Sequence, residues 1–275
     1  MLETRDFMSL TGKAIQIAKQ EGYACLVKKT VQYILTKIAN TWPVGYVRVS
    51  MARYKLRKNL IKLHKLDDII DFAFSFRCLG INIKPAQVKW EIERLLRLLH
   101  KRRLETVLEI GTANGGTLFL FSHIASQNAM LISIDLPRGP FGGGYPEWKV
   151  PLYKSFAREK QKIHLIRGNS HDPTTLGKVK QILTHRKVDF LFIDGDHSYR
   201  GVKKDFEMYS GLVKKGGMIA FHDIVPHPPE TGCGVSRFWR EIKNRYGHLE
   251  IIKDLRQKWA GIGLIKTDQD YLAID

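Results

Sequence analysis

The last two thirds of the chain consist of short apolar runs, which alternate with amphipathic stretches and polar turns. Five of these runs consist mostly of Val, Ile, Leu, Phe and Met and predict buried strands, at 107–110, 129–135, 163–167, 188–193 and 217–221. Buried strands that alternate with helices are typical of a parallel sheet covered on both faces. The pattern therefore predicts an α/β fold with a doubly wound sheet of five or more strands.

The C-terminal part adds three elements. Residues 235–242 predict a helix, and residues 248–252 and 261–265 predict two strands that are antiparallel neighbours.

The first 80 residues follow a different pattern. Residues 13–37 and 47–65 place apolar side chains every three or four positions with Lys and Arg between them, which predicts two basic amphipathic helices broken by residues 42–45. Residues 67–74 and 85–99 predict two more helices, the second with Pro85 in its first turn. We therefore expect a basic helical extension over residues 1–80 and the sheet domain over residues 81–275.

Composition and charge bound the class of protein. The 275 residues are 44% hydrophobic, enough for a full core, and no apolar run is long enough to cross a bilayer. No signal peptide is readable, so a cytoplasmic location is expected. The three cysteines lack Cys-x-x-Cys spacing and are expected to be free thiols in a reducing compartment rather than a disulfide or zinc set.

The net charge is +18, and most of the excess lies in the first 105 residues. Three roles for this basic extension stay open. It packs on the sheet domain or on a second subunit in a homo-oligomer, it docks on an anionic membrane surface, or it binds nucleic acid. The last is the least favoured, because aromatic residues are not interleaved with the charges as stacking platforms require.

Candidate chemistry lies after the strands. The run Val107-Leu-Glu-Ile-Gly-Thr-Ala-Asn-Gly-Gly-Thr-Leu118 joins a strand, a glycine turn and a helix start, and lets backbone N–H groups approach a nucleotide-like ligand. Each later strand also ends in polar residues, namely Asp135, Asn169 and Ser170, Asp194 to Tyr199, and His222 and Asp223. The carboxyl ends of parallel strands meet at one edge of a sheet, where ligands bind.

This order of motifs resembles the class I S-adenosylmethionine-dependent methyltransferases. The segments 192–199, 202–205 and 216–223 are similar to the small-molecule O-methyltransferase branch, which includes macrolide-sugar and cephalosporin-tailoring enzymes. The resemblance covers residues 85–267 and implies a Rossmann-like sheet of seven strands with the last strand antiparallel.

The resemblance also implies a cofactor site for S-adenosylmethionine. Glu109 lies near the methionine end of the cofactor and Asp135 holds the ribose. The turn is shaped by Gly111, Thr112, Asn114 and Gly115, the adenine is edged by Asn169 and Ser170, and Asp194 also belongs to this site.

Asp194 and His197 are the expected catalytic pair. They lie three residues apart just after the fourth predicted strand, so both side chains are expected over one cleft. His197 is the candidate general base, since imidazole titrates near neutral pH; the alternative is a helix-capping Asp with a solvent-facing His. Asp194, His222 and Asp223 are candidate ligands of a divalent metal, Mg²⁺ or, because His is a softer ligand, Mn²⁺, Fe²⁺ or Zn²⁺. Without a metal, His222 helps His197 to orient the acceptor.

Two loops are expected to enclose a substrate. Residues 136–148 are rich in Gly and Pro and are expected to form a mobile lid. Phe141, Tyr145 and Trp148 of this loop could stack on a sugar or ring of the substrate. Residues 226–235 carry His227 and Glu230 on the same edge.

The resulting hypothesis is an O-methyltransferase for a small hydroxylated acceptor, such as a sugar, glycan or natural-product intermediate. An RNA methyltransferase, whose nucleic-acid affinity falls steeply with salt, is one alternative. A metal-dependent hydroxylase and a catalytically idle binding module are two others.

Overall fold

The computed structural model describes residues 19–39, 42–139, 141 and 144–267, and the chain divides into two units at Val47/Arg48. The first unit holds helix α2 (Tyr23–Ala39) and the first residues of α3 (Trp42–Leu60). The two helices are separate, as predicted, but residues 42–45 belong to α3. Trp42 begins this helix, and Pro43 fits its first turn, where no intrahelical N–H donor is needed. Residues 13–18 of the predicted helix lie outside the described residues.

The second unit contains the rest of α3 and all later elements, so residues 48–80 share a unit with the sheet. The domain boundary near residue 80, between the helical extension and the sheet domain, stays a prediction. Helix α4 (Leu66–Ser75) lies where expected. Helix α5 (Lys89–His100) begins later than expected, with Val88 at its N-cap, so Pro85 precedes the helix. The pattern gave no sign of the short hairpin of β1 (Arg77–Cys78) and β2 (Ile81–Asn82).

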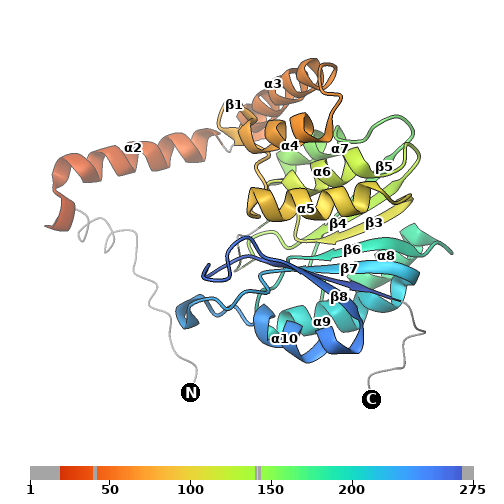
Figure 1. The fold of residues 1–275 in the computed structure, drawn as a ribbon. Coiled ribbons are helices and arrows are strands. Elements are labelled where there is room, and N and C mark those ends of the chain that lie inside the picture. The colour runs from red at the N-terminus through yellow and green to blue at the C-terminus, as the bar shows by residue number, and fades with distance from the viewer. Residues whose placement is uncertain (1–18, 40–41, 140, 142–143, 268–275) are drawn as a thin grey trace. The chain divides into compact units, whose positions relative to one another are not determined.

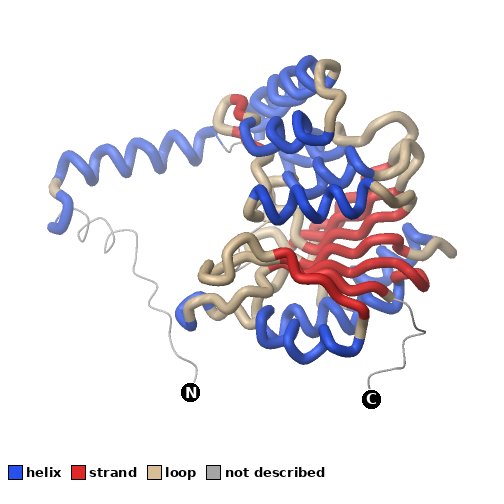
Figure 2. The backbone as a smooth tube through the Cα atoms, in the orientation of Figure 1, coloured by secondary structure: helices blue, strands red, loops and turns tan. Residues whose placement is uncertain are grey.

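Seven strands form the sheet, in the order β5-β4-β3-β6-β7-β9-β8 (Figures 1 and 2). They are β3 (Thr106–Ile110), β4 (Met130–Asp135), β5 (Lys162–Arg167), β6 (Val188–Ile193), β7 (Val213–His222), β8 (Gly247–Ile251) and β9 (Ile262–Lys266). The first five pair in parallel, and β9 runs antiparallel to β7 and β8. The predicted Rossmann-like sheet, with its last strand antiparallel, is confirmed.

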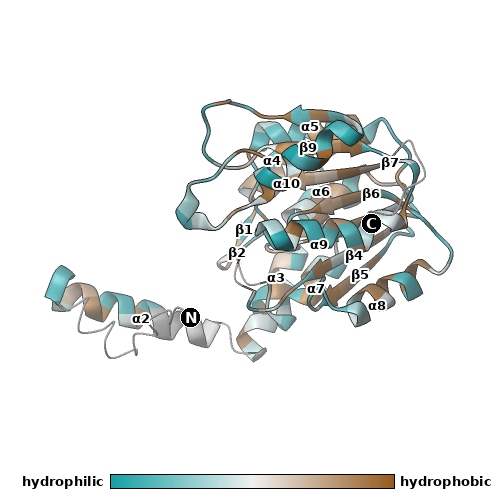
Figure 3. Cartoon of the chain, turned by 90° about the horizontal axis from the view of Figure 1, so that it is seen from below, coloured by the Kyte–Doolittle hydropathy of each residue, from teal (hydrophilic) through white to brown (hydrophobic). Residues whose placement is uncertain are grey.

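Helices cover both faces of this sheet (Figure 1). On one face lie α4, α5, α6 (Gly116–Ile124) and α7 (Val150–Lys154). On the other lie α8 (Pro173–Leu183), α9 (Tyr199–Tyr209) and α10 (Val235–Ile242). Figure 3 shows hydrophobic residues concentrated on the strands between these layers.

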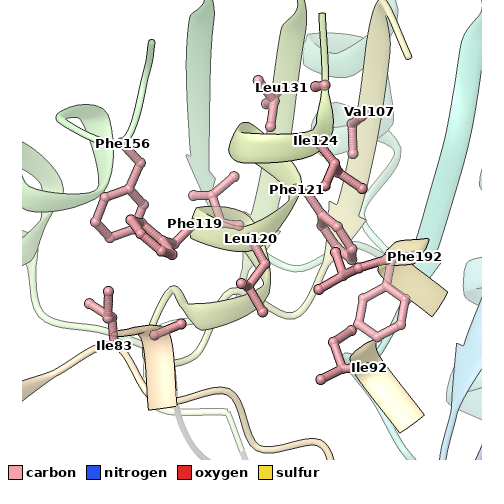
Figure 4. Packing of buried hydrophobic residues seen from close by; sticks show 14 of the residues in the cluster. Ile83, Ile92, Val107, Phe119, Leu120, Phe121, Ile124, Leu131, Phe156 and Phe192 are labelled. Carbon is pink, nitrogen blue, oxygen red and sulfur yellow. The ribbon is translucent and has the colours of Figure 1, made fainter. Parts of the chain in front are cut away.

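The alternation of side chains along each strand divides the interior into two cores. On β6, Phe190 and Phe192 face the α5–α6 side, while Leu191 and Ile193 face the α9–α10 side. Figure 4 shows the first core, where Phe121 of α6 packs edge-on to Phe192 with ring centroids 5.4 Å apart. Burial on both faces explains why these strands are apolar throughout.

The backbone at the carboxyl edge of the sheet is tied together beyond the strands themselves. Gly111 N–H donates to Ile134 C=O and Asp194 N–H donates to Ile110 C=O, each at 2.8 Å. Gly111 has φ +103°, and a Cβ there would lie 2.0 Å from the Asp194 carbonyl oxygen. Only glycine therefore permits this approach between the ends of β3 and β6.

Among the described residues, no helix combines the length and the apolar character that crossing a membrane requires.

Replacing Gly111 by Ala is expected to lower the free energy of unfolding by about 1–3 kcal/mol or more, because the new methyl group overlaps the Asp194 backbone. Gly177→Ala is the matched control: Gly177 lies inside α8 with open space around it, so alanine should raise stability by about 0.5–1 kcal/mol. Denaturant unfolding of both variants measures the difference. Equal effects of the two substitutions would contradict the close approach at Gly111.

Candidate active site

A pocket that is partly open to solvent lies at the carboxyl edge of the sheet. The residues after β3, β4, β5 and β6 form its wall: Ile110, Gly111, Ala113, Ile134, Asp135, Leu136, Gly139, Phe141, Gly144, Gly168, Asn169, Ser170, His171, Asp194, Gly195 and Asp196. Five of the predicted cofactor residues are in this wall, namely Gly111, Asp135, Asn169, Ser170 and Asp194. The other four, Glu109, Thr112, Asn114 and Gly115, are not in it.

Glu109 lies behind the glycine turn and is fully buried. Its Oε2 accepts a hydrogen bond from Ser133 Oγ at 2.5 Å, and Ser133 Oγ lies 2.6 Å from Thr112 Oγ1. Oε1 has no hydrogen-bond partner. Burial raises the pKa of Glu109 to about 8, although hydrogen bonds from Ser133 and Thr117 oppose this shift. The carboxyl is therefore protonated at neutral pH until a cation approaches it.

Gly115 and Asn114 act on the turn rather than on the pocket. Gly115 has φ +78° and is the N-cap of α6, a left-handed conformation that suits glycine. The Asn114 side chain is exposed, with Oδ1 3.5 Å from Lys149 Nζ.

Asp135 ends β4 and faces the pocket. Its Oδ2 accepts a hydrogen bond from Ala113 N–H at 2.6 Å, which fixes the carboxylate against the glycine turn. Burial raises the pKa of Asp135, and backbone hydrogen bonds oppose that shift. This is the position expected for a group that binds ribose hydroxyls.

His171 lines the pocket beside Asn169 and Ser170 and was not predicted from the sequence. Its Nε2 lies 3.2 Å from Oδ1 of the fully buried Asp205, and this contact raises the pKa of His171. Only its position just after β5 could have indicated His171 as a site residue. Its partner Asp205 lies in α9, 34 positions further along the chain, so the local sequence does not connect the two.

Asp194 is the centre of a hydrogen-bonded cluster. Gln87 Nε2 donates to its Oδ2 at 2.6 Å, while Oδ1 lies 3.0 Å from His222 Nδ1 and 3.5 Å from His197 Nε2. Gln87 precedes α5 and was missed, because nothing in the local sequence connects it to the end of β6.

Asp223 holds the other side of this cluster. Its Oδ2 lies 3.0 Å from His197 Nδ1, and its Oδ1 lies 3.3 Å from His222 Nδ1 and 3.1 Å from His227 Nε2. Ala260 N–H also donates to Oδ1, at 3.1 Å. Asp223 has φ +64°, a strained conformation for a non-glycine residue, so the backbone itself is bent to place this carboxylate.

His197 is therefore held between two carboxylates, with 24% of its side chain exposed. Helix capping falls to its neighbours: Ser198 Oγ accepts from Gly201 N–H, and Asp196 Oδ1 accepts from Ser198 N–H. Phe141 stacks on the His197 ring with centroids 5.2 Å apart and an interplanar angle of 14°. The arrangement leaves Asp194 free for the cluster.

The cluster stabilises its own charges. Burial alone would lower the pKa of both imidazoles, but the two carboxylates outweigh it and raise the pKa of His197 to about 11 and of His222 to about 10. Burial alone would raise the pKa of Asp194 and Asp223, and the imidazoles instead hold both below the usual range.

Two sets of three side chains in the described part of the chain place their donor atoms within 4.8 Å of one another, as a metal site requires. One set is Asp194, His197 and Asp223, and the other is Asp223, His227 and Cys233. His222 is in neither set, although its Nδ1 contacts both carboxylates.

The prediction that three aromatic residues of the loop 136–148 stack on the substrate is corrected in part. Tyr145 and Trp148 are buried in the core, where Tyr145 packs edge-on to Tyr153, so neither offers a free stacking face. Phe141 is 37% exposed and lines the pocket. In the second loop, His227 reaches Asp223 while Glu230 is exposed.

Comparison with known proteins bears on this geometry. Residues 108–224, from β3 to just after β7, match a family model described as a methyltransferase domain. The match agrees with the resemblance found in the motifs, because the segment from β3 to just after β7 is similar to a methyltransferase domain. It gives no support to the hydroxylase alternative.

Two curated relatives match part of the chain. One, named uncharacterized protein y4gI, from Sinorhizobium fredii, is 25% identical over 148 residues, which is 53% of this chain and 16% of that protein. The other, uncharacterized protein R132 of Acanthamoeba polyphaga mimivirus, is 31% identical over 165 residues, 55% of this chain and 66% of that protein. The chain therefore matches less than two thirds of the length of each.

Solved structures with a similar fold include the O-methyltransferase TomG from Streptomyces achromogenes, in complex with SAM. It is 16% identical, with a TM-score of 0.49, over 78% of this chain and 95% of that one. An O-methyltransferase from Bacillus cereus, in complex with SAH, is 17% identical, with a TM-score of 0.48, over 76% and 94%. At these values the likeness concerns the fold alone.

Replacing Glu109 by Gln tests its unusual protonation. Because the folded pKa of about 8 exceeds the unfolded value of 4.5, the folded state binds the extra proton between these values. The wild type should therefore lose stability relative to Glu109→Gln by up to about 1.4 kcal/mol per pH unit as the pH rises from 4.5 to 8, and no further above. Denaturant unfolding across this range measures the loss.

Glu207→Gln, at a half-exposed position on α9 beside Lys203, is the control and should run parallel to the wild type. A wild-type curve that stays parallel to that of Glu109→Gln would rule out the raised pKa.

Proposed function

We propose that this enzyme transfers the methyl group of S-adenosylmethionine to a hydroxyl of a small sugar-like acceptor, a glycan or natural-product intermediate, with His197 as general base. The observation that carries the proposal is the position of His197 between Asp194 and Asp223 beside the pocket. Its Nδ1 is held closely by Asp223, whereas Nε2 is only loosely paired with Asp194. Nε2 is therefore the nitrogen that receives a proton.

In this proposal, the cofactor lies along the carboxyl ends of the strands. Asp135 binds the ribose hydroxyls, and Asn169 and Ser170 edge the adenine. Gly111 lets the backbone come close to the ligand, and Glu109 lies toward the methionine end, where the ammonium group would favour the ionised carboxylate over the buried acid.

In the reaction, the acceptor oxygen attacks the methyl carbon in line with the sulfur. The C–O bond forms while the C–S bond breaks, and its electron pair stays on sulfur, giving S-adenosylhomocysteine and a methyl ether. The hydroxyl proton moves to His197 Nε2, which must be neutral to accept it. Asp223 on Nδ1 keeps the ring in place and stabilises the imidazolium that results.

A divalent metal, Mg²⁺ or Mn²⁺, fits this cluster. Asp194 Oδ1 and Asp223 Oδ1 lie 3.0 and 3.3 Å from His222 Nδ1, and carboxylate oxygens are the ligands that Mg²⁺ prefers. Asp194, His222 and Asp223 would hold the ion. When bound, it supplies positive charge that stabilises the acceptor oxyanion and offsets the carboxylates that keep His197 protonated.

A second hollow, whose lining includes Gln87, the hydrogen-bond partner of Asp194, supports the sugar-like acceptor. It is lined by Gln87, Asn114, Lys84 and Trp259 among others. Gln87 contacts Asp194, and Trp259 is 48% exposed and adjacent in sequence to Ala260, which donates to Asp223. An exposed indole beside amide groups suits the apolar face and the hydroxyls of a sugar ring.

The basic extension enters the proposal as a peripheral contact with an anionic membrane in the cytoplasm, where a lipid-linked glycan acceptor would be found. Helix α2 supports this with the adjacent Lys28 and Lys29, of which Lys29 is paired with Glu21, and with no acidic residue in its first turn. Nucleic-acid contact and a homo-oligomer are the competing roles of this segment.

His197→Ala is expected to lower kcat by about 10²–10⁴-fold, because the acceptor proton loses its base. The affinity for S-adenosylhomocysteine, measured by calorimetry, should change less than about threefold. Formation of S-adenosylhomocysteine is measured over a panel of sugars, nucleotide sugars and catechols. His185→Ala, at an exposed turn after α8, is the control. Wild-type turnover by His197→Ala would remove the residue from the mechanism.

Trp259→Ala is expected to raise KM for the acceptor by about tenfold or more while leaving cofactor affinity unchanged, since the indole lies outside the cofactor pocket. Trp90→Ala, which removes a similarly exposed indole on α5, should change neither. A loss of cofactor binding in Trp259→Ala, or an unchanged KM, would move the acceptor elsewhere.

A further inference from the structure

The loop after β7 brings a third kind of metal donor to the edge of the cluster. Cys233 lies between η3 (Pro229–Thr231) and α10, and its Sγ is within 4.8 Å of donor atoms of both Asp223 and His227. The three side chains are buried or half-buried. This set could not be predicted from the chain, because a lone cysteine ten positions from an aspartate has no recognisable ligand spacing.

The buried ring nitrogen Nε2 of His227 indicates a bound ligand, because no hydrogen bond satisfies it. Its Nε2 is inaccessible to solvent and lies 3.1 Å from Asp223 Oδ1, yet it makes no hydrogen bond of acceptable geometry. A buried ring nitrogen without a partner is costly, whereas a ring nitrogen coordinated to a cation is satisfied.

The backbone holds these three side chains in place. Asp223 adopts φ +64°, and its Oδ1 is anchored by Ala260 N–H. Cys233 N–H donates to Thr231 Oγ1 at 3.2 Å. The next residue, Gly234, donates to the His197 carbonyl at 2.8 Å, so the loop that carries Cys233 is tied to the catalytic segment.

We propose that Asp223, His227 and Cys233 form a binding site for a borderline-soft divalent cation, Zn²⁺ foremost. One thiolate, one imidazole and one carboxylate are three ligands of the types that Zn²⁺ prefers, and three protein ligands leave a fourth tetrahedral position for water or an acceptor oxygen. Mg²⁺ does not suit this set, because it requires hard oxygen ligands.

The site shares Asp223 with the catalytic cluster. Oδ1 faces His227 and Oδ2 faces His197, so the carboxylate bridges the two groups. A cation on the Oδ1 side would fix the orientation of Asp223 and, through it, the ring of His197. The proposal concerns a second site, and its test measures metal binding there rather than methyl transfer.

The test uses the full chain, stripped of metal with a chelator under reducing conditions and titrated with Co²⁺ as a spectroscopic substitute for Zn²⁺. The wild type should develop a near-ultraviolet thiolate-to-cobalt band that Zn²⁺ removes and excess Mg²⁺ does not. Cys233→Ser should lack this band, while Cys78→Ser, which alters a half-buried thiol in β1, should keep it.

Zn²⁺ affinity is measured in parallel by competition with a chromophoric chelator. Loss of an outer-shell partner alone costs about 10–100-fold in metal affinity, so Cys233→Ser and His227→Gln should each lose at least about tenfold. His185→Gln is the matched control for the second variant. If Cys233→Ser fails to fold, as judged by circular dichroism, His227→Gln decides the question.

Three results would overturn the proposal. They are the absence of a thiolate-to-cobalt band in the wild type, a band that persists in Cys233→Ser, and Zn²⁺ binding by His227→Gln as tight as that of the wild type.

Discussion

The close approach of the backbone at Gly111 and Asp194 is the constraint on which the site depends. A side chain at position 111 would overlap the Asp194 carbonyl, so the ends of β3 and β6 meet only because this residue is glycine. Hydrogen bonds from Gly111 to β4 and from Asp194 to β3 extend the sheet pairing beyond the strands. The pocket and the carboxylate of Asp194 therefore lie on the same rigid edge.

A second consequence is the density of charge at that edge. Asp194 and Asp223 end neighbouring strands and share His197 and His222 between them. Each carboxylate would be costly in this buried setting without these partners, and each imidazole is held protonated by them. The proposed catalysis by His197 thus requires that the carboxylates be neutralised in another way, and the convergence of donor atoms offers a cation as that means.

The strands could be predicted because burial on both faces makes each one a continuous apolar run, and β3 to β7 all lie where the pattern indicated. Polar residues at their ends could be assigned to one edge for the same reason. The antiparallel insertion of β9 came from family resemblance, since periodicity carries no information about strand direction.

Other features depend on contacts that a linear pattern does not contain. Tyr145 and Trp148 belong to a glycine-rich loop, yet they are buried against α7 and its surroundings. Gln87 and Cys233 reach the carboxylates only through the fold, because one precedes α5 and the other follows β7. Pro85, which precedes α5, and Pro43, which lies in the first turn of α3, show that a proline near a helical pattern marks a boundary without fixing on which side the helix begins.

The central claim is that the cofactor lies along the carboxyl edge formed by β3, β4, β5 and β6. Amide hydrogen exchange with and without S-adenosylhomocysteine tests it most directly. Bound ligand should slow exchange in residues 110–115, 135–139, 168–171 and 194–197, and should change it little in the β8 and β9 strands. Unchanged exchange in those four segments under saturating ligand would contradict it.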